Sequence, residues 1–243
     1  VEKIKYLIKN SIYLPERIVC ITFSNEAANN LISRVRRDID LKENGEPIIR
    51  TFHGFSADLL RKYGDKVGIN KEFNILTPDE AKVVLYRYLK VPVGNCHQYI
   101  GAIGTAKDLG ISWENLKKYL DEKMKKFEGI NIEKRLENLQ FELHTLYLKR
   151  DKFRKHEISE SIKKISSLLK LDKFLKAWGS YEKIKSIKNY QDYSDLNKNA
   201  LALLEKDKNV ADNYDYIIVD EFQDTNKVQL DLLFLLARKG NIT

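Results

Sequence analysis

The stretch that decides the fold of this chain runs from Tyr214 to Asn226 and reads YDYIIVDEFQDTN. The three β-branched residues 217–219 favour a strand that is buried on both faces of a parallel sheet. Asp220 and Glu221 follow directly, at the carboxyl end of that strand, where the functional residues of such sheets lie. Because successive side chains of an extended segment point in opposite directions, the two carboxylates can have different roles. One can hold Mg²⁺ while the other faces an attacking water molecule.

Two upstream segments repeat this pattern of a short strand followed by polar residues and a helix. Residues 17–23 (RIVCITF) predict a strand, after which Ser24 or Asn25 can cap an amphipathic helix. Residues 48–51 (IIRT) predict a second strand, and a further helix begins near His53. Alternating strands and helices indicate an α/β layered domain with a parallel sheet.

Between about residues 77 and 196 the apolar periodicity is helical throughout. Two stripes in this segment predict long helices packed in an antiparallel hairpin, with core packing as their explanation and a partner-binding helix as the alternative. The stripes consist of Ile132, Leu136, Leu139, Leu143, Leu146 and Phe153, then Ile158, Ile162, Ile165 and Leu169. The segment holds 24 Lys and Arg against 17 Asp and Glu, whereas the rest of the chain holds 19 against 18. The excess predicts a polyanionic partner, or else a lysine-rich solvated surface.

Cysteine content and hydropathy exclude several classes of protein. Cys20 and Cys96 form neither a disulfide framework nor a Cys/His metal spacing. No run of eighteen apolar residues and no signal-peptide pattern occurs, so we expect a cytoplasmic protein without membrane contact.

The polar segments after the strands carry a family resemblance. Residues 217–226 (IIVDEFQDTN) resemble motif II of superfamily 1 DNA helicases of the UvrD/Rep/PcrA type. Residues 22–28 (TFSNEAA) resemble motif Ia, and residues 51–55 (TFHGF) resemble the motif after the next strand. Residues 192–196 (DYSDL) resemble a smaller motif that ends the helical insertion and lines the DNA path. Glu26 departs from the family, which usually has lysine there, and an acid repels phosphate, so Glu26 stays outside the predicted site.

The resemblance implies a fold, an incomplete RecA-like parallel sheet with a large inserted all-α subdomain. Residues 1–76 and 197–243 correspond to the α/β part, and residues 77–196 to the insertion. The 243 residues contain no Gly-x-x-x-x-Gly-Lys-Ser/Thr, the P-loop that cradles nucleotide phosphates. We therefore expect a fragment that starts just after the P-loop and stops just after motif II. In the family the strand at 217–220 lies between the P-loop strand and the strand that begins at Asn241, so we expect an exposed sheet edge and a more stable helical part.

The resemblance also implies an activity. In the parent enzyme, ATP hydrolysis with Mg²⁺ drives 3′-to-5′ movement along single-stranded DNA and the unwinding of duplex and junction DNA. It assigns Asp220 to Mg²⁺, Glu221 to activation of water and Gln223 to a link between the γ-phosphate and the DNA-contacting elements. It assigns DNA contacts to Phe23, Ser24, Asn25, Thr51, Phe52 and His53. Aromatic rings suit bases, while hydroxyls and helix N-termini suit phosphates.

Two alternatives remain beside the helicase. One is a non-catalytic DNA-binding or regulatory protein built on a degenerate helicase module, and the other uses the helical middle as a protein-interaction arm. The fragment alone is expected to bind neither ATP nor Mg²⁺ tightly and to need the rest of the helicase for activity. The basic cluster Lys149, Arg150, Lys152, Arg154 and Lys155 near the predicted bend is either a solvated tip or a contact with duplex DNA.

Overall fold

The chain is divided into two units by its backbone contacts. The computed structural model describes residues 1–39, 45–149, 152–238 and 240–243. The α/β unit comprises residues 1–81, 104–110 and 185–243, and the helical unit comprises residues 82–103 and 111–184. Residues 104–110 and 185–196, which the resemblance assigns to the insertion, thus group with the α/β unit.

Three strands form the main parallel sheet of the α/β unit, in the order β2–β1–β5. They are β1 (Ile18–Thr22), β2 (Ile48–Thr51) and β5 (Tyr216–Val219). The last residues of the chain join the other side of β5, where the Ile217 amide donates to the Asn241 carbonyl at 2.9 Å and the Val219 amide to the Thr243 carbonyl at 2.9 Å. β5 therefore has a partner on both sides. The prediction that a P-loop strand is its neighbour is wrong, because β1 occupies that side.

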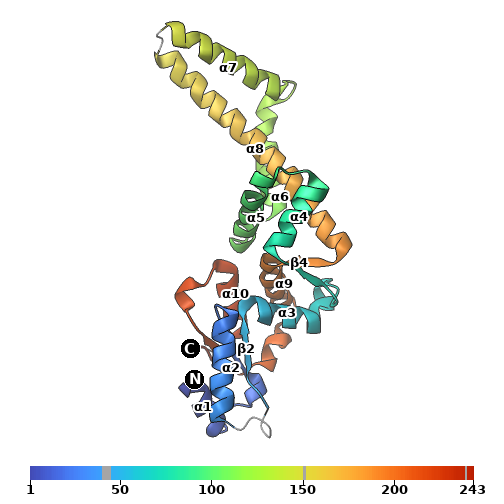
Figure 1. Ribbon diagram of the computed structural model, residues 1–243, viewed down its shortest axis with the longest axis vertical. Helices are drawn as coiled ribbons and strands as arrows, with labels where there is room; N and C mark the ends of the chain where they lie inside the picture. Colours follow the sequence, from blue (N-terminus) through green and yellow to red (C-terminus); the bar gives the residue numbers. More distant parts are fainter. Residues whose placement is uncertain (40–44, 150–151, 239) are drawn as a thin grey trace. The chain divides into compact units, whose positions relative to one another are not determined.

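Alternate residues of β1 point to opposite faces of this sheet, and each face has its own core. Val19 and Ile21 join a core with α3 (Phe52–Tyr63), α9 (Tyr193–Lys206) and α10 (Lys227–Leu236). Ile18 and Cys20 join a second core with α1 (Glu2–Lys9) and α2 (Asn25–Asp38). Helices thus cover both faces, as expected for a parallel sheet whose central strand β1 is buried throughout (Figure 1).

A second, two-stranded parallel sheet was not predicted. It pairs β3 (Asn74–Leu76) with β4 (Tyr190–Asp192), so the segment 77–196 is not helical throughout. A three-residue strand is too short to show a period of two, and its partner is remote in the sequence. The short 3₁₀ turns of the α/β unit are η1 (Pro15–Arg17), η2 (Gly64–Val67), η4 (Lys208–Asn213) and η5 (Phe222–Asp224).

The helical unit contains the predicted hairpin. Its elements are α4 (Pro78–Leu89), α5 (Val93–Asp108), α6 (Trp113–Met124), η3 (Lys125–Phe127), α7 (Ile132–Lys149) and α8 (Lys152–Lys188). Of these, α4 begins in the α/β unit, and α5 and α8 end in it. Figure 1 shows α7 and α8 side by side, and Ile132 and Leu139 are buried together with Ile158 and Ile165. The apolar seam is confirmed. Phe153 is an exception, because it is 85% exposed and does not belong to the seam.

The predicted fold class is confirmed, since a small parallel sheet carries a large all-helical insertion. Among the helices that the structure describes, none combines the length and apolar character needed to cross a membrane. In the predicted basic cluster, the side chains of Lys149 and Arg150 lie outside the described part of the structure.

Candidate functional site

The carboxyl ends of β2, β1 and β5 lie at one edge of the main sheet, called here the carboxyl edge. Thr22 at the end of β1 pairs in register with Thr51 at the end of β2, and Ile21 pairs with Val219 at the end of β5. Since the strands are parallel and neighbouring, the segments that follow them leave the sheet side by side. These segments, together with Thr51 at the end of β2, hold all nine residues that the resemblance assigns to the site, so the fold brings them to one edge.

The segment after β1 presents an aromatic ring to solvent. Thr22 is buried, and its hydroxyl donates to the Ser24 carbonyl at 3.0 Å. The Ser24 hydroxyl accepts the Ala27 amide at 3.1 Å and so caps α2. Phe23 is held between these two anchors with its side chain 64% exposed. Asn25 is the first residue of α2 and is also exposed, so the turn offers an aromatic face and a helix N-terminus together.

The segment after β2 is more enclosed. Thr51 caps α3 by accepting the Gly54 amide at 3.2 Å. Phe52 is only 4% exposed and lies in the core with α9 and α10. This corrects the predicted base contact of Phe52, because its ring cannot reach a base without leaving the core.

His53 is half-buried at the start of α3, beside an aromatic residue that was not among the predicted site residues. Its ring lies 5.0 Å from the Tyr193 ring, with 30° between their planes. Burial lowers the pKa of His53, and the Asp108 carboxylate opposes that shift only in part. Tyr193 is 39% exposed, and its sequence signal was its place within DYSDL.

The segment after β5 carries exposed acids on a constrained backbone. The Asp220 amide donates to the Ile21 carbonyl at 2.9 Å, which fixes this residue to β1. Glu221 has φ 54° and ψ 47°, a left-handed conformation that costs a residue with a side chain about 1–2 kcal/mol. Gln223 donates its side-chain amide to the Glu221 carboxylate. Asn226 and Gln229 then form a reciprocal capping box that starts α10.

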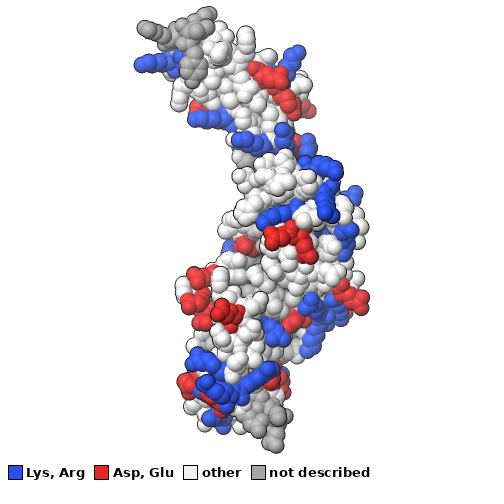
Figure 2. Space-filling view, viewed as in Figure 1, with Lys and Arg blue, Asp and Glu red and all other residues white. Residues whose placement is uncertain are grey.

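The acids of this segment suit a hard cation. Asp220, Glu221 and Asp224 are exposed, and Figure 2 shows acidic side chains gathered over the segment between β5 and α10. Mg²⁺ is bound through one or two carboxylates together with substrate phosphates and water. Asp220 fits such a role because its backbone is anchored while its carboxylate faces solvent.

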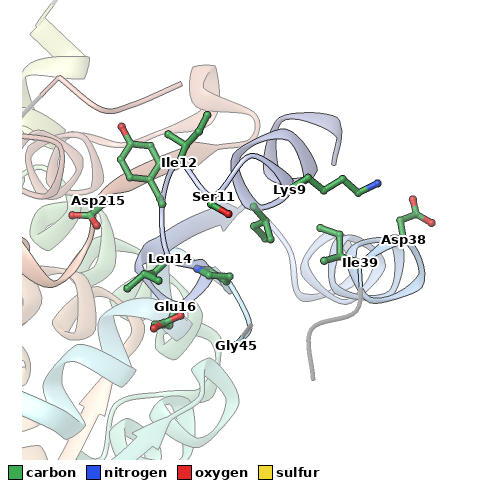
Figure 3. Close-up of a pocket in the computed structure, with 12 residues that line it drawn as sticks. Lys9, Ser11, Ile12, Leu14, Glu16, Asp38, Ile39, Gly45 and Asp215 are labelled. Atoms are coloured by element: carbon green, nitrogen blue, oxygen red, sulfur yellow. The ribbon is translucent and has the colours of Figure 1, made fainter. Parts of the chain in front are cut away.

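A pocket of about 950 Å³ lies elsewhere in the α/β unit. Its lining includes Leu14 and Glu16 before β1, Asp215 before β5, and residues of α1 and α2 (Figure 3). In Figure 3 the Lys9 and Asp38 side chains point away from its centre. This pocket lies toward the amino ends of the strands, and none of the predicted site residues lines it. Catalytic groups of parallel sheets lie at the opposite edge, so we place the site there.

Comparisons with known proteins show the family of this chain. The family model described as UvrD/REP helicase N-terminal domain matches residues 1–243. A "probable DNA helicase II homolog" of Mycoplasma capricolum is 28% identical over 249 residues, which cover 99% of this chain and 29% of the relative. The ATP-dependent DNA helicase PcrA of Staphylococcus aureus is 27% identical over 242 residues, which cover 98% of this chain and 27% of the relative. The chain thus spans less than a third of the length of these curated relatives.

Proposed function

The chain belongs to the UvrD/REP helicase N-terminal domain family, and we propose that it joins a single-stranded DNA contact to the Mg²⁺-binding and water-activating carboxylates of an ATP-dependent DNA helicase. One observation carries this proposal. The strand order β2–β1–β5 brings exposed Phe23, the ring of His53 and the carboxylate of Asp220 to neighbouring strand ends. The names of the relatives support the same activity, which we propose to include movement from 3′ to 5′.

The DNA contact uses the segments after β1 and β2. Phe23 stacks on a base, because its ring is exposed and anchored on both sides by the Thr22 and Ser24 hydrogen bonds. The amino ends of α2 and α3, with Asn25 and Thr51, face the phosphates, where helix N-termini and hydroxyls bind best. The basic excess of residues 77–196 adds sequence-independent attraction.

The chemical step uses the segment after β5. Asp220 holds Mg²⁺, which supplies charge neutralisation on the nucleotide phosphates when bound. Glu221 accepts a proton from the attacking water. Gln223 holds the Glu221 carboxylate through its side-chain amide and links the γ-phosphate to the DNA-contacting elements.

Binding of single-stranded DNA tests the first half of the proposal. Fluorescence anisotropy with a labelled oligonucleotide should show weak binding that falls steeply as salt rises. Phe23→Ala should lose about 1–3 kcal/mol of binding free energy, the contribution of one stacked base. Phe234→Ala is the matched control, because Phe234 is 61% exposed on α10 of the same unit and lies outside the site. Equal affinity in Phe23→Ala and Phe234→Ala would exclude Phe23 from the contact.

Phosphate release tests the second half. The 243 residues contain no P-loop, so we propose that this chain alone does not hydrolyse ATP. In the whole protein, Glu221→Gln should lower DNA-stimulated phosphate release about 10²–10⁴-fold, as expected for loss of a general base. Hydrolysis by the isolated chain that Glu221→Gln abolishes would contradict the proposal.

The second candidate is a non-catalytic DNA-binding or regulatory protein built on the same module. It has the same predicted DNA contact, but Glu221 has no catalytic role in it. In that case Phe23→Ala weakens DNA binding, while Glu221→Gln changes no activity of the whole protein.

A further inference from the structure

The pocket of about 950 Å³ in the α/β unit has a lining that the proposed function does not use (Figure 3). Its apolar part is mainly aliphatic. Ile12 and Leu14, called here the aliphatic rim, are 45% and 59% exposed, and Ile39 is buried beside them. Ligand sites are commonly pockets of this kind, mostly apolar with a few polar groups. Because covering exposed aliphatic side chains is favourable, the rim suits a ligand with an aliphatic body.

The charged side chains around the pocket favour a cation. Its lining holds the carboxylates of Glu16, Asp38 and Asp215. Asp215 is paired with Arg17 at 2.5 Å, and Asp38 is paired with a lysine and an arginine. Within the described part of the chain, no ion pair or hydrogen bond engages the Glu16 carboxylate. Lys9, the basic residue of the lining, points away from the centre in Figure 3, so the negative charge of Glu16 is left uncompensated.

The backbone adds to this negative character. α1 ends at Lys9 and α2 ends at Asp38, and both helix ends border the pocket. A helix carries a partial negative charge at its carboxyl end, which favours a cation nearby. Arg36 and Arg37 in the last turn of α2 are paired with acids, whereas the end of α1 has only Lys9 in its last turn. The carboxyl end of α1 is therefore a second place in this pocket that suits a cation.

Ser11 stands at that end of α1 on a strained backbone. Its φ is 50°, its amide donates to the Ile8 carbonyl at 2.9 Å, and the Ile12 amide donates to the Leu7 carbonyl at 3.0 Å. Glycine is the usual residue in such a helix-ending turn, because the left-handed conformation is unfavourable for a residue with a side chain. The Ser11 hydroxyl lines the pocket, and no described residue hydrogen-bonds to it. Strain of this kind is common at ligand sites, and a hydroxyl oxygen can accept from an ammonium group.

We propose that this pocket binds a small aliphatic diamine. One ammonium group lies against the Glu16 carboxylate, and the other lies at the carboxyl end of α1 beside the Ser11 hydroxyl. Figure 3 shows Leu14 between these two residues on the same side of the pocket, where the alkyl chain covers it. A quaternary ammonium fits less well, because it needs a cage of open aromatic faces, and the ring of Tyr13 in the lining already packs against Tyr216 at 5.5 Å.

Titration of the ¹⁵N-labelled chain by NMR, without DNA or nucleotide, tests the inference at low salt. The probes are 1,4-diaminobutane, 1,6-diaminohexane and 1,8-diaminooctane, and the tightest of them is used further. The amide signals of Ser11, Leu14 and Gly45 should shift and saturate. The diamine should bind about two- to fivefold more tightly than hexylammonium, the range for a cation at an exposed helix carboxyl end. The uncharged 1,6-hexanediol should cause no saturable shift.

Two variants assign the two ends of the diamine. Glu16→Gln should weaken the binding of both the diamine and hexylammonium about two- to fivefold, the range for an exposed ion pair. Ser11→Gly should weaken the binding of the diamine alone, and it should keep the fold because glycine relieves the left-handed strain. Glu72→Gln is the matched control. Glu72 is an exposed acid of the same unit outside the pocket, so its replacement changes the total charge equally and should leave the affinity unchanged.

Three results would overturn the inference. They are equal affinity of the wild-type chain and both pocket variants, a diamine that binds no more tightly than hexylammonium, and unsaturated shifts that Glu16→Gln and Glu72→Gln reduce equally. The last result would mean attraction by surface charge alone. None of them bears on the proposed function, because the titration contains no DNA or nucleotide and leaves the carboxyl edge intact.

Discussion

The main sheet and the α7–α8 hairpin differ in how far their apolar patterns lead to burial. In the α/β unit, twenty buried residues form the core on the α3, α9 and α10 face, and nine form the core on the α1 and α2 face. Where α7 packs against α8, the cluster of described residues has four buried members, and seven others, two of them before α7, pack against these only partly buried. The hairpin nevertheless has the longer and more regular sequence pattern.

This difference shows that regular apolar spacing predicts the type of secondary structure but not how deeply the side chains are buried. Two helices share one narrow seam, so each seam residue keeps one flank in solvent. A strand between two helical layers is enclosed on both faces and both edges. We therefore expect the sheet to be more stable than the sequence alone predicts, because β5 is paired on both sides and Ile217 is fully buried.

Truncation of one core leucine in each region should show the largest difference in stability between the two regions. Leu203→Ala on α9 should lower the free energy of unfolding of the α/β unit by about 2–5 kcal/mol, because a fully buried site leaves a cavity. Leu139→Ala in the hairpin should cost less than half as much, since its small cluster can collapse.

The two units report on unfolding through different probes. Trp113 and Trp178 both lie in the helical unit, so their fluorescence follows that unit. Cys20 is buried in β1 and its pKa is raised by burial to about 12, so its labelling in a Cys96→Ala background follows the sheet. Equal loss of Cys20 protection in Leu203→Ala and Leu139→Ala would show that the units unfold as one.

Hydrogen exchange should rank the regions in the same order. The amides of Ile217 and Val219 each donate at 2.9 Å within the sheet, and we expect them to exchange among the slowest. Amides of α7 near Leu139 should exchange faster, through local opening of the hairpin. Slower exchange in α7 than in β5 would contradict the comparison.

Two residues with positive φ give a smaller and more local test. Glu221 has φ 54° in the α/β unit, and Lys90 has φ 55° in the helical unit. Replacement of either by glycine should relieve strain and stabilise its own unit by up to about 1 kcal/mol, after the added entropy of the unfolded chain. Glu221→Gly should also abolish DNA-stimulated ATP hydrolysis in the whole protein, whereas Lys90→Gly should leave it intact. A loss of stability in Glu221→Gly would mean that the carboxylate contributes more than its strain costs.

The smallest expected effect is a pH dependence confined to the α/β unit. Burial lowers the pKa of His53 below 6.5. Just below pH 6.5, His53 is therefore protonated more often in the unfolded chain than in the folded chain. Stability contributed by neutral His53 is thus complete above pH 6.5 and is lost as pH falls from 6.5 through the folded-state pKa. Protection of Cys20 measured between pH 7.5 and 5.5 should show this slope, and His53→Gln should remove it. The same slope in His53→Gln would assign it to another group.

Elements with local signals could be predicted from the sequence. The run 217–219 indicated β5, and Ser24 indicated a helix start that the structure confirms as a cap. The helical seam followed from spacing alone. These patterns predicted an α/β domain with a parallel sheet and a helical middle, and the family resemblance added the RecA-like class.

Features that depend on remote pairing could not be predicted. β4 exists because Tyr190–Asp192 pairs with β3, and three residues carry no period of their own. The burial of Phe52 and the exposure of Phe23 depend on which side of the sheet each turn leaves, although both follow a strand-ending threonine. The sequence around Lys107 does not distinguish it from other lysines, because its partners Asp192 and Asp195 are remote in the sequence.

The hydrogen bond from the Asp220 amide to the Ile21 carbonyl joins the segment after β5 directly to the end of β1. Phe23 lies two residues beyond that carbonyl, and Asp220 is the residue that we propose to hold the metal. If Phe23 follows the DNA as proposed, gain or loss of a base pulls on the same peptide link that positions the metal ligand. Movement along the DNA strand and ATP hydrolysis can therefore be coupled within one sheet, without a larger rearrangement.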